Sequence, residues 1–433
     1  MNTTNPAPVW QPRRVLVTGA AGFLGQALVA KHVAATSGAC DVLLTDLAPS
    51  RTSPAHARWV CGDVADPQLW DRLMEKPIDL VIHLAAIVSG RAEAEPALGR
   101  RVNLLAPLEM LERCRLQHST TGIRARVVLS SSIAVYGTPL PLQMRDDHPI
   151  RPSLSYGTHK RMIEIALADA SRRGEIDGRT IRLSGVVVRP PQPNGALSGF
   201  NSDMIRQPLT GHDYTCPVGP DACTWLTSLD VAVDQLWHAA QTSEALWLQA
   251  LPTGERALTA PTWPVTMSDL QAALGEMDAT APQRLRFDPH SPLHAQFGRW
   301  PQDVVFEQAA LLGLPSDWQR HQGHLAHMLR SAMPHPTHPL EFGPTHRRPG
   351  PHAAPGFFAR GGRGRSRLWQ THDRHRQPAR RKHALLHVLG APSRCRAAGG
   401  RSGPRHSGAL HHGVGVGRFV DEPQRHAHEL GLA

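Results

Sequence analysis

A glycine-rich turn after a short apolar run constrains the fold of this chain more than any other segment. The turn reads TGAAGFLG over Thr18–Gly25 and follows the apolar run Arg14–Thr18. A strand that enters a helix through such a turn begins a β-α-β unit whose loop holds the pyrophosphate of a dinucleotide. Gly19 permits the tight turn, Gly22 lets the backbone approach the pyrophosphate, and Gly25 lets the helix pack closely on the sheet. The cofactor contacts expected from this loop are Gly19, Gly22, Phe23, Leu24 and Gly25.

The first 333 residues alternate short apolar runs with amphipathic stretches. The expected strands are Arg14–Thr18, Val42–Asp46, Ala57–Cys61, Leu80–Leu84, Arg126–Ser132 and Gly178–Arg189. The expected helices are Gly22–Ala35, Pro67–Glu75, Pro96–Leu116 and Ser153–Arg173. This order predicts an α/β fold, a Rossmann-type doubly wound parallel sheet with a small, loop-rich C-terminal substrate-binding subdomain. The expected divisions are an N-terminal extension (1–12), a dinucleotide-binding Rossmann domain (13–190), the subdomain (191–333) and a disordered tail (334–433).

The tail differs from the rest of the chain in composition. It holds 17 of the 47 Lys and Arg residues but 5 of the 36 Asp and Glu residues, which leaves 30 basic and 31 acidic residues elsewhere. A segment rich in Arg, His, Pro and Gly with little apolar periodicity buries too little surface to offset its ordering entropy. Three interpretations stay open: translation through a frameshift, a disordered basic appendage, and a nucleic-acid-binding arm. Nucleic acid is the least favoured, because the arginine run 360–367 has no interleaved aromatic residues and no binding module.

The sequence also indicates the cellular compartment in which the protein is expected. No stretch of about 20 apolar residues is long enough to span a membrane. Residues 1–12 lack the basic-then-apolar order of a signal peptide. The six cysteines form no Cys-x-x-Cys pair, as expected for reduced thiols. We therefore expect a cytoplasmic protein with no membrane partner and no metal site.

A carboxylate after the second expected strand favours NAD over NADP. Asp46 stands 21 residues after Gly25, where it can accept hydrogen bonds from the adenosine ribose and repel a 2′-phosphate. Arg51 nearby can soften that preference. Asp63, after the third strand, can meet the adenine amino group or only shape a turn. The other cofactor contacts expected at these strand ends are Val64, Leu84, Ala85 and Ala86.

The sequence Ser-Tyr-Gly-Thr-His-Lys supplies the expected catalytic groups. Tyr156 and Lys160 stand one helical turn apart and so share a face. A nearby ammonium lowers the pKa of a phenol from about 10, so Tyr156 can accept a hydroxyl proton while a hydride leaves the same carbon. Ser132, 24 residues earlier at a strand end, can hold the reacting oxygen and is preferred over Ser130 on the same face. Tyr156 and Lys160 are also expected to contact the cofactor.

Asn103 is a further candidate for the cofactor site. It lies within the expected helix Pro96–Leu116, in Arg-Val-Asn-Leu. Its amide can fix the backbone or a water near the catalytic lysine, or it can be an ordinary polar residue on a helix face. His83, by contrast, is expected to be a packed histidine.

These motifs and their order resemble the extended short-chain dehydrogenase/reductase family, in its NAD-dependent epimerase/dehydratase-like branch. The motifs are TGAAGFLG (18–25), Asp46, GDV (62–64), HLAA (83–86), SSSIAVYG (130–137) and YGTHK (156–160). Less general segments, within residues 13–330, resemble the D-erythronate dehydrogenase subfamily: 84–94, 171–179, 188–194, 205–209, 216–218 and 300–301. The resemblance implies oxidation of the C2 hydroxyl of a four-carbon sugar acid to its 2-oxo acid, with NAD as acceptor. It also implies a homodimer, because extended members often pair through a four-helix interface.

An acid substrate needs a cationic or amide-rich anchor for its carboxylate. Arg206 and Asn194 are the candidates for that anchor, and Ser89 and Glu93 are candidates for binding hydroxyl groups. Arg206 can equally make only a surface ion pair, and Asn194 can equally shape a turn. The chain departs from the subfamily pattern at Leu183–Val186, Pro191 and Asp203.

Two other functions stay open. A nucleotide-sugar epimerase or dehydratase has the same fold, so the fold cannot separate them. A dehydratase usually carries an acidic pair beside the catalytic serine, where this chain has Ile133 and Ala134. A non-catalytic dinucleotide sensor with a nucleic-acid-binding tail would not need the pair of Tyr156 and Lys160, so that pair favours an enzyme.

Overall fold

The computed structural model describes residues 10–333, without 37–39, 52 and 192–195. Four predictions lie partly or wholly outside the described residues: the N-terminal extension, the basic tail, the role of Asn194 and, at residues 192–195, the substrate-binding subdomain. The remaining predictions fall on described parts of the chain.

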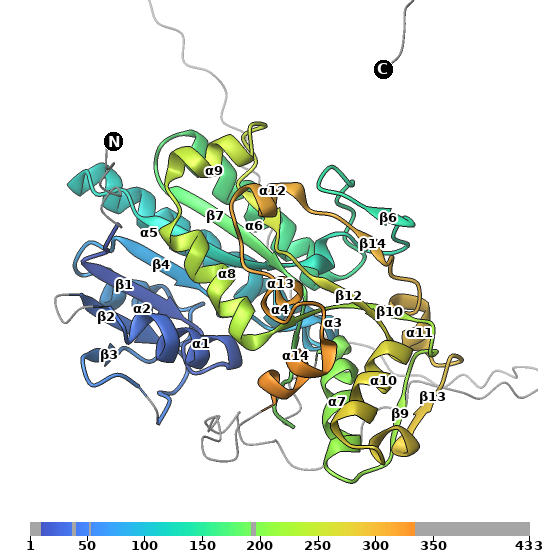
Figure 1. Ribbon diagram of the computed structural model, residues 1–433. Helices are drawn as coiled ribbons and strands as arrows, with labels where there is room; N and C mark the ends of the chain where they lie inside the picture. The colour runs from blue at the N-terminus through green and yellow to red at the C-terminus, as the bar shows by residue number, and fades with distance from the viewer. Residues whose placement is uncertain (1–9, 37–39, 52, 192–195, 334–433) are drawn as a thin grey trace, which may run out of the picture. The chain divides into compact units, whose positions relative to one another are not determined.

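A seven-stranded parallel sheet forms the centre of the described chain (Figure 1). Its order is β11-β7-β5-β4-β1-β2-β3, and every neighbouring pair is parallel. The strands are β1 (Arg14–Thr18), β2 (Asp41–Thr45), β3 (Ala57–Trp59), β4 (Leu80–His83), β5 (Arg126–Ser132), β7 (Asp177–Leu183) and β11 (Ala257–Thr259). The chain builds outward from β1 in one direction and from β4 in the other. Ligands of such sheets bind at the carboxyl ends of the strands beside this switch point, and the predicted doubly wound fold is confirmed.

Alternate residues of each strand enter two separate cores. In β1, Val15 and Val17 pack in one core and Leu16 packs in the other. The first face is covered by α1 (Phe23–Leu28), the π-helix η1 (Val29–Val33), α8 (Leu229–Gln241), α9 (Glu244–Ala250) and α12 (Glu307–Leu311). The second face is covered by α2 (Pro67–Leu73), α5 (Ala106–Thr121) and α6 (Ser155–Arg172). Because both faces are buried, the strands are apolar throughout instead of alternating apolar and polar residues.

The predicted strand Gly178–Arg189 is wrong as a single strand. Its first half is β7 in the large sheet, but its second half, β8 (Gly185–Val187), belongs to another sheet. Ser184 stands between them, and its hydroxyl lies 2.7 Å from the Thr227 hydroxyl in that other sheet. A continuous apolar run cannot show that a chain changes sheets, because both halves are buried.

Two predicted helices contain π-helical turns. The predicted helix Gly22–Ala35 is α1 followed by η1, and Pro96–Leu116 is α4 (Pro96–Arg100), the π-helix η2 (Arg101–Leu105) and then α5. A separate short helix, α3 (Ser89–Ala94), precedes α4. The predicted helices Pro67–Glu75 and Ser153–Arg173 are α2 and α6, with ends shifted by at most two residues.

A second, smaller region is built around a three-stranded sheet in the order β12-β10-β8 (Figure 1). Its strands besides β8 are β10 (Cys223–Ser228) and β12 (Trp263–Thr266). Two short parallel pairs join β9 (Tyr214–Cys216) to β13 (Leu285–Phe287) and β6 (Gln143–Met144) to β14 (Asp303–Val304). The helices after residue 191, besides those on the large sheet, are α7 (Phe200–Leu209), α10 (Met267–Met277), α11 (Pro292–Phe297), α13 (Asp317–Arg320) and α14 (Leu325–Ala332). The 3-10 turns are η3 (Ile133–Val135), η4 (Leu197–Gly199) and η5 (Ala281–Arg284).

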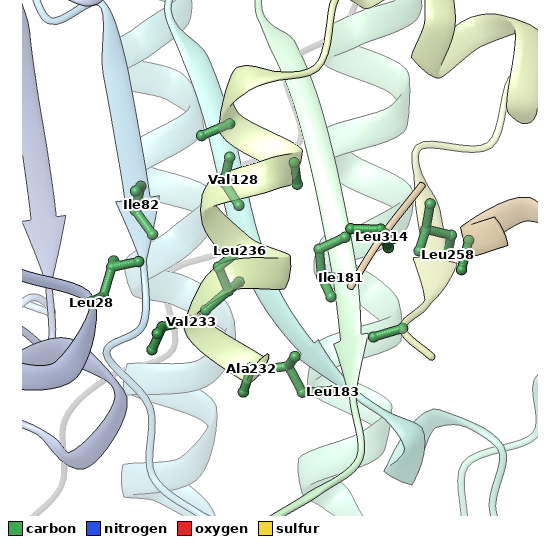
Figure 2. Packing of buried hydrophobic residues seen from close by; sticks show 14 of the residues in the cluster. Leu28, Ile82, Val128, Ile181, Leu183, Ala232, Val233, Leu236, Leu258 and Leu314 are labelled. Atoms are coloured by element: carbon green, nitrogen blue, oxygen red, sulfur yellow. The ribbon is translucent and has the colours of Figure 1, made fainter. Parts of the chain in front are cut away.

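The chain returns to the large sheet after residue 191, the predicted start of the subdomain. Strand β11 pairs with β7 as an edge strand, and α8 covers one face of the sheet. Figure 2 shows Val233 and Leu236 of α8 grouped with Val128 of β5 and Ile181 of β7. The segment that follows the predicted boundary therefore also completes the first core.

Within the described ranges, no helix is long and apolar enough to cross a membrane. The same residues contain no group of three or more His, Cys, Asp and Glu side chains placed to hold a metal ion.

Replacing Leu236 should test the core between α8 and the sheet. Leu236 is fully buried, so Leu236→Ala should lower the free energy of unfolding by about 2–5 kcal/mol through lost burial and a residual cavity. Leu246→Ala on α9 is the matched control: this leucine is 55% exposed, so the change should be within about 0.5 kcal/mol. Urea unfolding of both variants measures the difference, and equal losses would contradict the packing described here.

Candidate active site

The glycine loop is folded tightly against the ends of β1 and β4. Gly19 has φ 69°, and a Cβ atom there would lie 2.7 Å from the backbone nitrogen of Ala85. A Cβ atom on Gly25 would lie 2.1 Å from the carbonyl oxygen of Gly19. A side chain at either position would therefore push the loop away from its neighbours. The tight turn and the close packing expected from these two glycines are both present.

Asp46 joins the end of β2 to the glycine loop. Its carboxylate accepts hydrogen bonds from the backbone N–H groups of Ala21, at 3.1 Å, and Leu47, at 2.8 Å. Burial raises the pKa of Asp46, and these two hydrogen bonds act in the opposite direction. The carboxylate thus stands at the loop where the ribose contact is predicted.

The end of β4 is fixed through Thr18 at the end of β1. The Thr18 hydroxyl accepts hydrogen bonds from the N–H groups of Leu84 and Ala85, both at 3.3 Å, and lies 2.9 Å from Nδ1 of His83. Burial lowers the pKa of His83 to about 3, and the charge of Lys160 adds to this effect. The imidazole is therefore neutral at physiological pH. This buried, neutral ring hydrogen-bonds the Thr18 hydroxyl, so His83 is the packed histidine that its sequence position suggested.

Asn103 holds the backbone that follows β4. Its Oδ1 accepts the N–H of Ile87 at 2.8 Å, and its Nδ2 donates to the carbonyl oxygen of the same residue at 2.7 Å. The side chain is buried. Asn103 was expected to fix the backbone, to fix a water or to be an ordinary polar residue on a helix face. The structure supports the first of these roles.

Tyr156 and Ser132 meet where the start of α6 approaches the end of β5. A Cβ atom on Gly157 would lie 2.2 Å from the carbonyl oxygen of Ala134, just past Ser132. Only glycine allows the helix to approach this turn so closely. The Ser132 hydroxyl accepts the N–H of Ala134 at 3.2 Å and interacts with the Tyr156 phenol. The sequence-based prediction included Gly157 only as part of the YGTHK motif. A glycine between Tyr156 and Lys160 could have predicted a close backbone approach at this point.

Lys160 is buried beneath Tyr156. Its Nζ donates to the carbonyl oxygen of Ser130 at 2.7 Å and lies 5.7 Å from the centre of the Tyr156 ring. Burial lowers the pKa of Lys160 to about 8, although the charge of Glu164 acts in the opposite direction. The side chains of Tyr156 and Lys160 thus share one helix face, as predicted.

A cation that sequence reasoning did not name acts on Tyr156. Burial raises the pKa of the Tyr156 phenol, while the charge of Arg189 and the Ser132 hydroxyl act to lower it. The expectation assigned the lowering charge to Lys160. In the structure that charge belongs to Arg189, two residues after β8.

Glu164 is a second residue that sequence reasoning missed. It lies one turn beyond Lys160 on α6, is fully buried, and accepts two hydrogen bonds from Arg182 of β7, at 3.0 and 2.9 Å. It also accepts the Ser131 hydroxyl of β5 at 2.6 Å. This network ties the catalytic helix to two strands of the sheet.

The described substrate candidates all make contacts within the protein. The Ser89 hydroxyl accepts the N–H of Leu197 at 3.3 Å, and the Glu93 carboxylate accepts the N–H of Ser155 at the start of α6. Arg206 pairs with Asp203 and donates to the carbonyl oxygen of Arg189. Ser89 and Glu93 thus connect α3 to the elements that surround the site.

The candidates near the adenine end are also engaged. The Asp63 carboxylate accepts the N–H of Ala65 at 2.9 Å and pairs with Arg101 at 3.0 Å. The carbonyl oxygen of Val64 accepts the indole N–H of Trp70 at 2.8 Å. Four other predicted contacts are half-buried, two in the first turn of α1 and two just after β4: Phe23, Leu24, Leu84 and Ala86.

The buried charge of Lys160 should be visible in the pH dependence of stability. Its pKa is about 8 when folded and about 10.4 when unfolded, so between these values the unfolded chain binds more protons and stability rises with pH. Relative to Lys160→Met, the cofactor-free wild type should therefore gain about 2 kcal/mol between pH 8 and pH 10. Below about pH 7, where Lys160 is protonated in both the folded and the unfolded state, the difference should stay nearly constant.

Urea unfolding of both proteins from pH 7 to pH 10 measures this gain. Lys76→Met, at an exposed lysine, is the matched control and should follow the wild type at all pH values. A difference between wild type and Lys160→Met that stays flat above pH 8 would contradict the buried position of the ammonium.

Comparison with known proteins gives the family. The sequence profile of the NAD dependent epimerase/dehydratase family matches residues 15–246. The chain is 37% identical over 314 residues to D-erythronate dehydrogenase from Cupriavidus necator, which covers 70% of this chain and 94% of the relative. It is 33% identical over 310 residues to the Haemophilus influenzae protein of the same name, with 70% and 95% covered.

Solved structures agree with this result. The nucleoside-diphosphate-sugar epimerase from Agrobacterium tumefaciens has a TM-score of 0.65 at 30% sequence identity, and the similarity covers 76% of this chain and 96% of that one. The predicted family, fold and cofactor are confirmed. This chain belongs to the NAD dependent epimerase/dehydratase family and is an NAD-dependent oxidoreductase.

Proposed function

We propose that this protein oxidises the C2 hydroxyl of a small, D-erythronate-like sugar acid to the 2-oxo acid. The observation that carries the proposal is the Tyr156 phenol beside Ser132, with Lys160 buried on the same helix face. Two relatives matched over almost their whole length bear the name D-erythronate dehydrogenase. The matched region includes the predicted anchor segment after β8.

The protein groups at this site fit NAD. Gly22 caps α1 without a side chain, so the first N–H groups of that helix have no side-chain cap. Asp46 places a carboxylate at the same loop, where a ribose can be bound. Asn103 would act at a distance, by holding the Ile87 backbone on the cofactor side of β4.

The reaction needs one proton and one hydride to leave the substrate. Tyr156 accepts the C2 hydroxyl proton as the general base, and Ser132 holds the reacting oxygen through its hydroxyl. Bound NAD supplies the acceptor for the hydride that leaves C2 with the C–H bonding electrons. The Lys160 ammonium, 5.7 Å from the centre of the Tyr156 ring, would stabilise the phenolate through its charge. In the reverse direction Tyr156 donates the proton to the carbonyl oxygen.

A nucleotide-sugar epimerase is the second candidate. The Agrobacterium structure, which carries an epimerase name, shares the fold over most of the chain. Against dehydratase chemistry, Ile133 and Ala134 follow Ser132 where an acidic pair is usual. A panel of substrates separates the two candidates.

Replacing the base should abolish turnover without unfolding the protein. With NAD and a panel of C4–C6 sugar acids, the wild type should form NADH, and Tyr156→Phe should lower kcat by about 100-fold or more. Reduced-cofactor absorbance at 340 nm measures both. Binding of NAD, measured by calorimetry, should stay within a few fold because the aromatic ring remains.

Tyr136→Phe is the matched control for this test. The Tyr136 hydroxyl lies 2.5 Å from the Thr259 hydroxyl on β11 and also interacts with Arg182, so its loss removes buried contacts but none with Ser132, Tyr156 or Lys160. Turnover should persist in this variant. If the wild type binds NAD but converts only nucleotide sugars, the epimerase candidate replaces the proposal.

We also propose that the protein is a homodimer. The outer faces of α5 and α6, which pack side by side, expose Leu108, Leu116, Met162 and Ile165, with 37–54% of each side chain accessible. Pairing two such faces would bury these side chains in a four-helix interface. Sedimentation should show a dimer, and the double variant Met162→Glu, Ile165→Glu should shift it to monomer. A wild-type monomer at micromolar concentration would exclude this interface.

A further inference from the structure

The position of the substrate carboxylate follows from the proposed chemistry. In a 2-hydroxy acid the carboxylate carbon is bonded directly to the carbon that carries the reacting hydroxyl. A group that binds the carboxylate must therefore lie beside Tyr156 and Ser132. This requirement excludes cations that stand away from the phenol.

Arg206, the predicted anchor, is already occupied. Its Nη2 pairs with Asp203 on the same helix, and its Nη1 donates to the carbonyl oxygen of Arg189 at 2.6 Å. The side chain is 12% exposed. Releasing Arg206 to a substrate would leave the Asp203 carboxylate without its partner.

Arg189 lies close enough to the Tyr156 phenol for the two groups to interact electrostatically. Leu183 at the end of β7 is paired in register with Ser132 at the end of β5, and the chain then runs through β8 directly to Arg189. The charges of Arg189 and Tyr156 act on each other. Within the described chain, Arg189 is the positively charged group that acts on the pKa of Tyr156.

Hydrogen bonds hold both the backbone and the side chain of Arg189 in place. Its backbone N–H donates to the Ser202 hydroxyl at 3.0 Å, and its carbonyl oxygen accepts the hydrogen bond from Arg206. Its Nε donates to the carbonyl oxygen of Val186 at 3.1 Å. The two Nη groups have no hydrogen-bond partner within the described part of the chain and are not sealed from solvent. The protein thus holds the backbone and Nε of this half-buried residue and leaves its two Nη groups available to a ligand.

We propose that Arg189 binds the carboxylate of the acid substrate through its two Nη groups. Arg206 and Ser202 of α7 are positioning residues that hold the Arg189 backbone. A guanidinium with two donors on one edge suits a carboxylate, which accepts two parallel hydrogen bonds. The inference rests on the proposed function, because only an acid substrate brings a carboxylate beside the reacting carbon.

The test compares arginine variants of the full-length protein with NAD and D-erythronate. Arg189→Met should raise KM by about tenfold or more, the loss expected when a charged hydrogen-bonding partner is removed. Binding of NAD should change less than about threefold. Arg189→Lys should recover part of the loss because it restores the charge. Arg286→Met, at an exposed arginine on β13, is the matched control and should behave as the wild type.

A pH profile separates substrate binding from a structural role. The charge of Arg189 favours the phenolate, so in Arg189→Met the acid limb of kcat/KM should move to higher pH. In Arg206→Met the limb should stay in place, because that residue acts only on the Arg189 backbone. Arg189→Met with an unchanged KM and an unmoved acid limb would overturn the assignment. A larger rise in KM in Arg206→Met than in Arg189→Met, with the acid limb unmoved in both variants, would also overturn it.

Binding of oxalate distinguishes failure of this inference from failure of the proposed function. Oxalate resembles the planar 2-oxo acid and is titrated by calorimetry into the protein loaded with NADH. If no sugar acid is oxidised but oxalate binds the wild type at least about tenfold more tightly than Arg189→Met, the proposed reaction is wrong and the anion site stands. Equal affinities overturn the Arg189 site whatever the activity, and a wild type that neither binds oxalate nor oxidises an acid overturns both.

Discussion

The buried ion pair of Glu164 with Arg182 holds the catalytic helix on the sheet. Glu164 lies one turn beyond Lys160 on α6, and it bonds Arg182 of β7 and Ser131 of β5 at the same time. Burying two charges is unfavourable unless their hydrogen bonds are satisfied, and removing one partner of such a pair typically costs about 3–5 kcal/mol. The position of α6, and with it the position of Tyr156, therefore depends on an interaction that takes no part in the chemistry.

The site is assembled mainly through backbone contacts. Gly157 lets α6 approach the turn after Ser132, and Gly25 lets α1 approach Gly19. The Asn103 side chain hydrogen-bonds the Ile87 backbone, and the Thr18 hydroxyl accepts hydrogen bonds from two backbone N–H groups at the end of β4. Each contact fixes main chain, so the side chains that it carries have little freedom. This arrangement suits an enzyme that must align a hydroxyl, a base and a cofactor ring at once.

The sequence predicted most of the large sheet and the elements that carry Tyr156, Lys160 and Ser132. These predictions succeeded because parallel strands buried on both faces have continuous apolar runs, and because motifs such as YGTHK keep fixed spacing on one helix. Strand β11 was not predicted, since three residues give no periodic signal and its pairing with β7 spans about 80 positions. Arg189 was missed for a related reason. Its importance comes from the change of sheets after Leu183, which an apolar run does not reveal.

Strand β11 and helix α8 have a consequence for how such a protein can change over time. Both come from the part of the chain that follows Pro190, yet one forms an edge of the cofactor sheet and the other covers Val128 and Ile181. The residues before Pro190 therefore do not contain the whole cofactor-binding sheet and its core. A single genetic crossover at Pro190 could not transfer a complete cofactor-binding domain from one protein to another. Insertions and deletions that alter substrate range are tolerated only where they leave both elements in place. The loops around α7 can change in length without displacing either element from the cofactor sheet.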